Sequence, residues 1–138
     1  MLKLLISRRL PESVMAEAAH HFDVACRPVT TPMDHAECVA ALRDHDIILP
    51  TLGDAFRAPA FSEVPDARCK LLANFGVGYN HIDVTAARAA GIAVTNTPGA
   101  VTDATADIAM TLILMTARRA GEGERMVRTG QWAGWHPT

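Results

Sequence analysis

The sequence lacks the cysteine pattern of a disulfide-stabilised protein. Its three cysteines, Cys26, Cys38 and Cys69, are odd in number and contain no CxxC pair. This usage argues against a disulfide framework and is typical of a reducing compartment, so we expect buried thiols in a cytoplasmic protein. An excess of one charge is also missing, because 13 basic and 15 acidic residues give a net charge of -2. This balance predicts no nucleic-acid partner and no membrane partner.

The motifs of several enzyme classes are missing as well. None of the six histidines stands in an HExxH pattern, and the spacing in residues 35–38 is more typical of a solvated helix face, so no metal site is expected. Ser7, Ser13 and Ser62 lie outside any GxSxG elbow, which leaves serine hydrolysis without a nucleophile. The apolar run at the start is too short for a signal peptide, and residues 1–9 instead predict a first strand.

Apolar residues, by contrast, are abundant. They make up 49% of the 138 residues, and the nine glycines raise the share to roughly 55%, above the ~45–50% of typical soluble domains. A chain of this length suits one domain and can bury roughly two-thirds of its unfolded surface. The excess predicts that some apolar surface meets another domain or subunit.

Short β-rich segments alternate with helical segments. The predicted strands cover residues 3–7, 23–27, 46–50, 70–75 and 92–95, and the predicted helices between them cover 12–21, 34–43 and 84–90. Asp34 and Asp83 are placed to cap two helices, and Gly91 is placed to end one in the left-handed conformation. This alternation predicts an α/β fold with a mostly parallel, doubly wound sheet that is covered on both faces.

A further helix is predicted over residues 103–119, and residues 108–117 within it are apolar around nearly the whole circumference. Such a helix is expected to be buried, and it is too short to cross a bilayer, which takes about 20 apolar residues. After Gly121 the sequence becomes polar and is expected to form turns. The tail carries Trp132 and Trp135, whose rings we expect to cover a surface.

One segment has the pattern of a ligand site. A predicted strand runs into residues 76–83 (GVGYNHID), here called the glycine loop, and then into a helix. Open α/β sheets bind ligands at this end of their strands, and two glycines allow successive backbone N–H groups to face a small anion. The N–H groups of Val77 and Gly78 are the predicted donors. Two or three charge-assisted hydrogen bonds would contribute ~1.5–3 kcal/mol each, against an association cost of at least ~4 kcal/mol, so the loop alone is expected to bind weakly.

The glycine loop is close to the dinucleotide pattern GxGxxG but departs from it. His81 stands in place of the third glycine, and Asn96 stands where an acidic residue would bind the ribose. Both departures argue against a dinucleotide-binding site. A degenerate nucleotide site and a glycine turn without a ligand remain the alternatives to an anion site.

Four segments together resemble a known family. They are residues 74–83 (NFGVGYNHID), 89–99 (AAGIAVTNTPG), 102–119 and 128–137 (RTGQWAGWHP). They resemble the D-isomer-specific 2-hydroxyacid dehydrogenases over essentially the whole chain. The last segment is most similar to the glyoxylate and hydroxypyruvate reductase branch.

The resemblance implies a two-domain oxidoreductase of which this chain is the amino-terminal part. Residues 1–100 would be a flavodoxin-like substrate-binding domain. Residues 101–138 would be an inter-domain and dimerisation helix with a tail, at the start of a Rossmann cofactor domain. The GxGxxG core of that domain, the substrate-gripping arginine, the carboxylate and the proton-transferring histidine of the family lie outside these residues. No catalytic residue is therefore expected here, and the chain alone would be inactive.

The resemblance also implies roles for individual residues. Val77 and Gly78 would hold the carboxylate of a small 2-keto or 2-hydroxy acid, and Leu52 and Gly53 would flank the same pocket. Thr105, together with Val77, would approach the nicotinamide end of NAD or NADP, and helix capping is the alternative role for Thr105.

The implied assembly is a homodimer formed through residues 103–120, in which Trp135 would reach the active site of the neighbouring subunit. Ordinary packing is the alternative role for both. The favoured function is reduction of glyoxylate or hydroxypyruvate by hydride transfer. One alternative is a non-catalytic carboxylate-binding or scaffolding module that dimerises through residues 108–117. The other is a related formate, lactate or phosphoglycerate enzyme or a corepressor.

Overall fold

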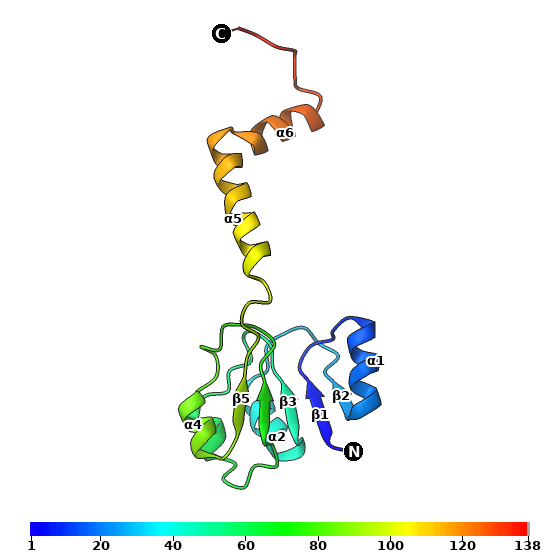
Figure 1. Cartoon of the computed structure of the whole chain (residues 1–138), viewed down its shortest axis with the longest axis vertical. Helices are drawn as coiled ribbons and strands as arrows, with labels where there is room; N and C mark the ends of the chain where they lie inside the picture. Colours follow the sequence, from blue (N-terminus) through cyan, green and yellow to red (C-terminus); the bar gives the residue numbers. More distant parts are fainter. Residues whose placement is uncertain (138) are drawn as a thin grey trace. The chain divides into compact units, whose positions relative to one another are not determined.

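The computed structural model describes residues 1–137, which form two compact units, Met1–Pro98 and a second that begins at Gly99. Each unit is described by itself. The described elements of the first unit are β1 (Lys3–Ile6), α1 (Glu12–His21), β2 (Asp23–Cys26), α2 (His35–Asp44), β3 (Ile47–Leu49), α3 (Ala58–Ser62), β4 (Leu71–Ala73), α4 (Val84–Ala89) and β5 (Ala93–Thr95). Those of the second unit are α5 (Thr102–Ala117) and α6 (Ala120–Arg128) (Figure 1).

The strands of the first unit form one parallel sheet in the order β2-β1-β3-β4-β5. The chain moves from β1 outward to β2 at one edge of the sheet, and after β2 it moves in the opposite direction, through β3 and β4 to β5 at the other edge. Because such crossovers are right-handed, α1 lies on one face of the sheet, and α2, α3 and α4 lie on the other. The predicted parallel α/β fold is confirmed. The short helix α3 was not predicted.

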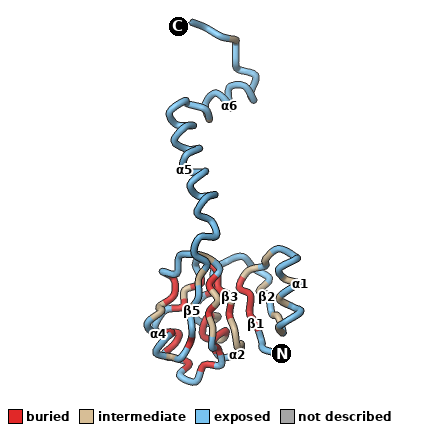
Figure 2. Tube along the Cα trace, in the orientation of Figure 1, coloured by how far each residue is buried: buried red, intermediate tan, exposed pale blue. Residues whose placement is uncertain are grey.

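The hydrophobic core lies between the sheet and the helices α2, α3 and α4. Leu5, Ile48 and Leu72 are neighbours in the strand register and point into this core together with Leu42 and Phe56. Figure 2 shows buried residues in the central strands β1, β3 and β4 and in α2 and α4, whereas α1 is largely exposed. No residue of α1 is buried, so this helix covers its face of the sheet less completely than the sequence pattern predicts.

The predicted helix ends of the first unit agree with the structure. The Asp34 carboxylate accepts a hydrogen bond from the Glu37 N–H at 2.8 Å, and the Glu37 carboxylate accepts one from the Asp34 N–H at 2.9 Å, which forms a capping box at α2. Asp83 caps α4 by accepting from the Ala86 N–H at 2.9 Å. Gly91 has a φ of 72° just after α4, as expected for a left-handed helix end.

The prediction that the apolar helix is buried is wrong for the structure described. No residue of α5 is buried, and Ile108, Leu112 and Ile113 are 61%, 57% and 60% exposed. Apolar side chains surround this helix, so its only helical neighbour within the described part of its unit, the polar helix α6, cannot cover them. Among residues 1–137, no helix is both long and apolar enough to cross a membrane.

The prediction of turns after Gly121 is also wrong, because α6 occupies residues 120–128. Arg119 adopts a left-handed φ of 52°, which separates α5 from α6. Local ion pairs then stabilise α6, with Arg119 bonded to Glu122 at 2.6 Å and Arg128 bonded to Glu124 at 2.6 Å. These i,i+3 and i,i+4 pairs offset the low helix propensity of the glycines in its first turn.

Candidate functional site

The candidate site lies at the carboxyl edge of the sheet in the first unit. In a parallel sheet the strand ends share one edge, and here the segments after β1, β3, β4 and β5 converge on it. The connection reverses direction between β1 and β3, which is the usual place for a ligand in such a fold. The glycine loop follows β4, and residues 51–54 follow β3.

Hydrogen bonds to three successive carbonyl groups hold the start of the glycine loop. The buried Asn74 side chain donates from Nδ2 to the carbonyl oxygens of Gly76 at 3.0 Å and Gly78 at 2.9 Å. Between them, the Val77 carbonyl accepts from Asn96 Nδ2 at 2.9 Å. Gly76 has a φ of 150°, a conformation that favours glycine. The Thr97 N–H also donates to the Gly76 carbonyl at 3.1 Å, so residues that directly follow β4 and β5 fix the peptide planes of this turn.

The two predicted anion donors remain available. Within residues 1–137, no hydrogen bond uses the N–H of Val77 or Gly78, and both residues are exposed. Their carbonyl groups, in contrast, are occupied as described above. The loop therefore presents backbone donors but not acceptors at these positions, which suits a carboxylate or a similar small anion.

The segment after β3 packs against the glycine loop. Thr51 forms a parallel bridge with Phe75, and a side-chain methyl of Leu52 lies 4.0 Å from the position that a Cβ at Gly76 would occupy. Leu52 is 60% exposed, and Gly53 has a φ of 98°. The structure thus brings Leu52 to the start of the glycine loop, whereas Gly53 lies against the Pro32 and Arg8 side chains.

A buried carboxylate that the sequence reasoning missed holds this segment. Asp54 is fully buried and accepts hydrogen bonds from the Thr51 N–H at 2.8 Å and the Met33 N–H at 2.9 Å. Burial alone would raise the pKa of Asp54. The Ser7 hydroxyl, these N–H groups and the Arg8 guanidinium outweigh burial, and the pKa lies below its ordinary value.

Arg8 directly follows Ser7 after the end of β1, and its guanidinium group bonds to neighbouring segments of the protein. It donates to the Thr51 hydroxyl, to the Leu52 carbonyl at 2.9 Å and to the Thr30 carbonyl at 2.7 Å, and it lies 3.7 Å from the Asp54 carboxylate. Its position after a strand at the switch point was the signal that could have identified it. Because these partners use Nε and Nη1, Arg8 braces the segment of residues 51–54.

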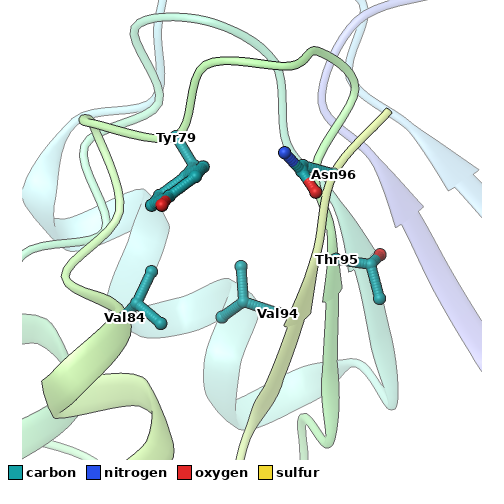
Figure 3. Close-up of a pocket in the computed structure, with 5 residues that line it drawn as sticks. All are labelled: Tyr79, Val84, Val94, Thr95 and Asn96. Carbon is teal, nitrogen blue, oxygen red and sulfur yellow. The ribbon is translucent and has the colours of Figure 1, made fainter. Parts of the chain in front are cut away.

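A hollow of about 230 Å³ opens beside the glycine loop. It is lined by Tyr79, Val84, Val94, Thr95 and Asn96. Figure 3 shows Tyr79 and Asn96 facing each other across it, Val84 and Val94 closing one side, and the Thr95 side chain directed away. Two of the five lining residues, Val84 and Val94, are apolar, and the phenol and the amide are the polar groups that face the hollow.

The glycine loop does not fit the pyrophosphate of a dinucleotide. In a dinucleotide site the phosphates sit at the helix amino terminus, but here the Asp83 carboxylate occupies that position through its bond to the Ala86 N–H at 2.9 Å. A second anion there would be repelled. Among residues 1–137 there is also no group of three or more His, Cys, Asp or Glu side chains arranged to hold a metal ion.

The other two predicted site residues belong to the second unit. Thr105 lies in the first turn of α5, is exposed, and donates its backbone N–H to the Val101 carbonyl at 2.9 Å. Its hydroxyl makes no capping bond in the part of the chain described, so the capping role finds no support. Trp135 is 80% exposed.

These features define an α/β domain with a five-stranded parallel sheet and a candidate small-anion site at its switch-point edge. The sequence matches the model of the D-isomer specific 2-hydroxyacid dehydrogenase catalytic domain over residues 4–132, and the chain belongs to this family. The resemblance noted from the sequence is therefore confirmed.

Curated relatives include a glycerate dehydrogenase from Hyphomicrobium methylovorum, 41% identical over 135 residues, with 98% of this chain and 42% of the relative covered. A glyoxylate reductase from Thermococcus kodakarensis is 38% identical over 139 residues, with 98% and 41% covered. The chain thus spans about two-fifths of the length of these relatives.

Solved structures show the same fold. An NADPH-dependent glyoxylate/hydroxypyruvate reductase from Sinorhizobium meliloti, in complex with NADP and malonate, matches with a TM-score of 0.76 and 31% identity over 99% of this chain and 41% of that chain. A structure from Polaromonas sp. JS6 66, assigned to the NAD-binding D-isomer specific 2-hydroxyacid dehydrogenases, matches with a TM-score of 0.87 and 35% identity over 100% and 43%.

Proposed function

We propose that this chain is the amino-terminal part of an NAD(P)-dependent 2-hydroxyacid dehydrogenase that reduces glyoxylate or hydroxypyruvate. The observation that carries the proposal is the pair of free N–H groups at Val77 and Gly78, held outward at the carboxyl edge of the sheet. The relatives named for glyoxylate and glycerate, at 38% and 41% identity, support the substrate class.

In this proposal the residues of the chain bind and orient the acid. The N–H groups of Val77 and Gly78 donate to the substrate carboxylate, and Leu52 limits the space beside them. Hydride and proton both come from groups outside residues 1–138. The main cofactor site lies outside them as well, because the glycine loop does not fit a pyrophosphate. The chain alone is therefore inactive and binds acids weakly.

We further propose that residues 1–100 form the substrate-binding domain and that residues 101–138 begin the cofactor domain. In the assembled enzyme Thr105 approaches the nicotinamide end of the cofactor. Residues 103–120 pair with a second subunit, and Trp135 reaches the neighbouring active site. The exposed apolar surface of α5 supports the pairing, because such a surface is unfavourable in water without a partner.

The activity is tested with a longer version of the protein and both nicotinamide cofactors. Oxidation of NADH or NADPH with glyoxylate or hydroxypyruvate is the expected result, and failure with both acids contradicts the proposal. Binding is tested separately on the 138-residue chain, where titration with oxalate should shift the backbone amide NMR signals of Val77 and Gly78 most strongly.

The dimer is tested by sedimentation of the 138-residue chain. Ile113→Glu should shift the chain towards the monomer, because it places a charge on the apolar surface of α5. Ala16→Glu is the matched control, since Ala16 is an exposed helix position in the first unit. A wild-type chain that is monomeric at all concentrations, or equal behaviour of the two variants, contradicts the pairing.

The second candidate is a non-catalytic carboxylate-binding or scaffolding module that dimerises through residues 108–117. The exposed apolar helix favours it, since such a surface would serve assembly without catalysis. It predicts oxalate binding and dimerisation by a longer protein that oxidises neither cofactor. Calorimetry with oxalate or glycerate that shows no heat at millimolar ligand would remove the binding role.

A further inference from the structure

His81 and Asn74 form a buried pair beneath the glycine loop. They are 5% and 2% exposed, and His81 Nε2 lies 2.9 Å from Asn74 Oδ1. Asn74 Nδ2 already donates to two carbonyls, so the atom facing His81 is an oxygen that only accepts. His81 must therefore carry its hydrogen on Nε2.

The rest of the imidazole supports this assignment. His81 Nδ1 is buried and has no hydrogen-bond partner among residues 1–137, so a proton there would be costly. Burial also lowers the pKa of His81, which favours the neutral ring. Asp54 and Arg57 are the charged groups that influence it, and they act in opposite directions. A neutral histidine with hydrogen on Nε2 thus fixes the rotation of the Asn74 amide.

The orientation of this amide sets the direction of a backbone donor. In a trans peptide the C=O and N–H bonds point to opposite sides of one plane. The Gly76 carbonyl accepts from Asn74 Nδ2 at 3.0 Å and from the Thr97 N–H at 3.1 Å, so the Val77 N–H of the same plane points away from both donors. The bond from Asn96 to the Val77 carbonyl does the same for the Gly78 N–H. Asn74 also holds the Gly78 carbonyl, which closes the turn.

We propose that Asn74, held in one rotation by His81, is a positioning residue that aims the Val77 N–H at the substrate carboxylate. Asn74 does not touch the acid and acts only through the backbone of the glycine loop. This inference rests on the proposed carboxylate site. It gives His81 a role other than proton transfer to the substrate, for which its burial makes it unsuitable.

The test compares four variants of the 138-residue chain by oxalate titration, followed through the amide signals of Val77 and Gly78. Asn74→Asp keeps the shape but removes the donor, and His81→Leu removes the N–H that orients Asn74. His81→Gln restores a donor close to the position of Nε2. His20→Leu is the matched control, because His20 is an exposed histidine on α1.

Asn74→Asp and His81→Leu should weaken oxalate binding about tenfold, which is the factor expected for one poorly aimed charge-assisted hydrogen bond. His81→Gln should recover most of this loss, and His20→Leu should bind as the wild type does. Nitrogen-15 spectra of the wild type should show His81 neutral with hydrogen on Nε2. A purely structural role would lower the unfolding free energy without this order of affinities.

Three results would overturn the inference. Wild-type affinity in a folded Asn74→Asp variant would show that the amide donor does not aim the loop. Equal losses in His81→Gln and His81→Leu would show that the Nε2 donor is irrelevant, and hydrogen on Nδ1 would contradict the pairing itself. Absence of oxalate binding by the wild type would instead refute the proposed carboxylate site, and this inference with it.

Discussion

Replacing Asp54 with alanine tests whether a buried carboxylate holds the segment of residues 51–54 in shape. The side chain is fully buried, and its oxygens accept from the N–H groups of Thr51 and Met33 at 2.8 and 2.9 Å. Its nearest cation is Arg8 at 3.7 Å. Asp54→Ala leaves two N–H groups without acceptors and a part-buried guanidinium without its counter-charge.

The expected cost follows from these contacts. Each buried N–H left unsatisfied costs about 1–3 kcal/mol, and breaking a buried ion pair by removing one partner costs about 3–5 kcal/mol. The contributions overlap, so we expect a loss of about 3–5 kcal/mol from the unfolding free energy. This is a large part of the roughly 5–15 kcal/mol that stabilises a typical domain.

Urea denaturation followed by far-ultraviolet circular dichroism is the suitable assay. Both tryptophans, Trp132 and Trp135, lie in the second unit, so their fluorescence does not report on the sheet. Asp66→Ala is the matched control, because Asp66 is exposed and its replacement should change stability by no more than about 0.5 kcal/mol. A loss of less than about 1 kcal/mol in the unfolding free energy of Asp54→Ala would refute the view that this carboxylate holds the segment of residues 51–54.

Three further predictions concern pH, backbone conformation and thiol reactivity. The pKa of Asp54 is lower in the folded protein than the unfolded value of about 3.9. The ionised carboxylate therefore stabilises the fold fully above about pH 3.9, and this stabilisation is lost as the pH falls through the folded pKa. The urea midpoint of Asp54→Asn should consequently fall less steeply in acid than that of the wild type. Gly76→Ala should lower the unfolding free energy by about 1–3 kcal/mol because alanine is strained at a φ of 150°. Crowding is not the cause, since the atom nearest to an added Cβ is 3.8 Å away. Unchanged stability and unchanged oxalate affinity would contradict this prediction. Burial raises the pKa of Cys38 to about 12 and of Cys69 to about 11, so mass spectrometry should find the half-buried Cys26 alkylated first in the native protein.

Local sequence signals determined much of the first unit. The strands and the capped helices were predictable because alternation, Asp34, Asp83 and Gly91 act within a few residues of the structure that they specify. The glycine loop and its two donors were predictable for the same reason. The family could be identified from the sequence because its motifs are contiguous segments.

Other features depended on contacts between distant or weakly marked residues. Helix α3 has only five residues, and α6 carries glycines in its first turn, so neither has a strong propensity signal. The exposure of α5 could not be predicted from its apolar composition, because burial requires a partner as well as an apolar surface.

The sequence by itself determined the place of a glycine turn after β4 and predicted its two backbone donors. Only the tertiary structure decided how that turn is held. Arg8 contacts the Thr51–Leu52 segment across more than 40 residues, and Asn96 reaches the Val77 carbonyl from the next strand. His81 stood out in the sequence only as a departure from GxGxxG, whereas in the structure it orients Asn74. The physical reason is that hydrogen-bond direction is set where separate strands meet, and strand proximity is a property of the folded sheet.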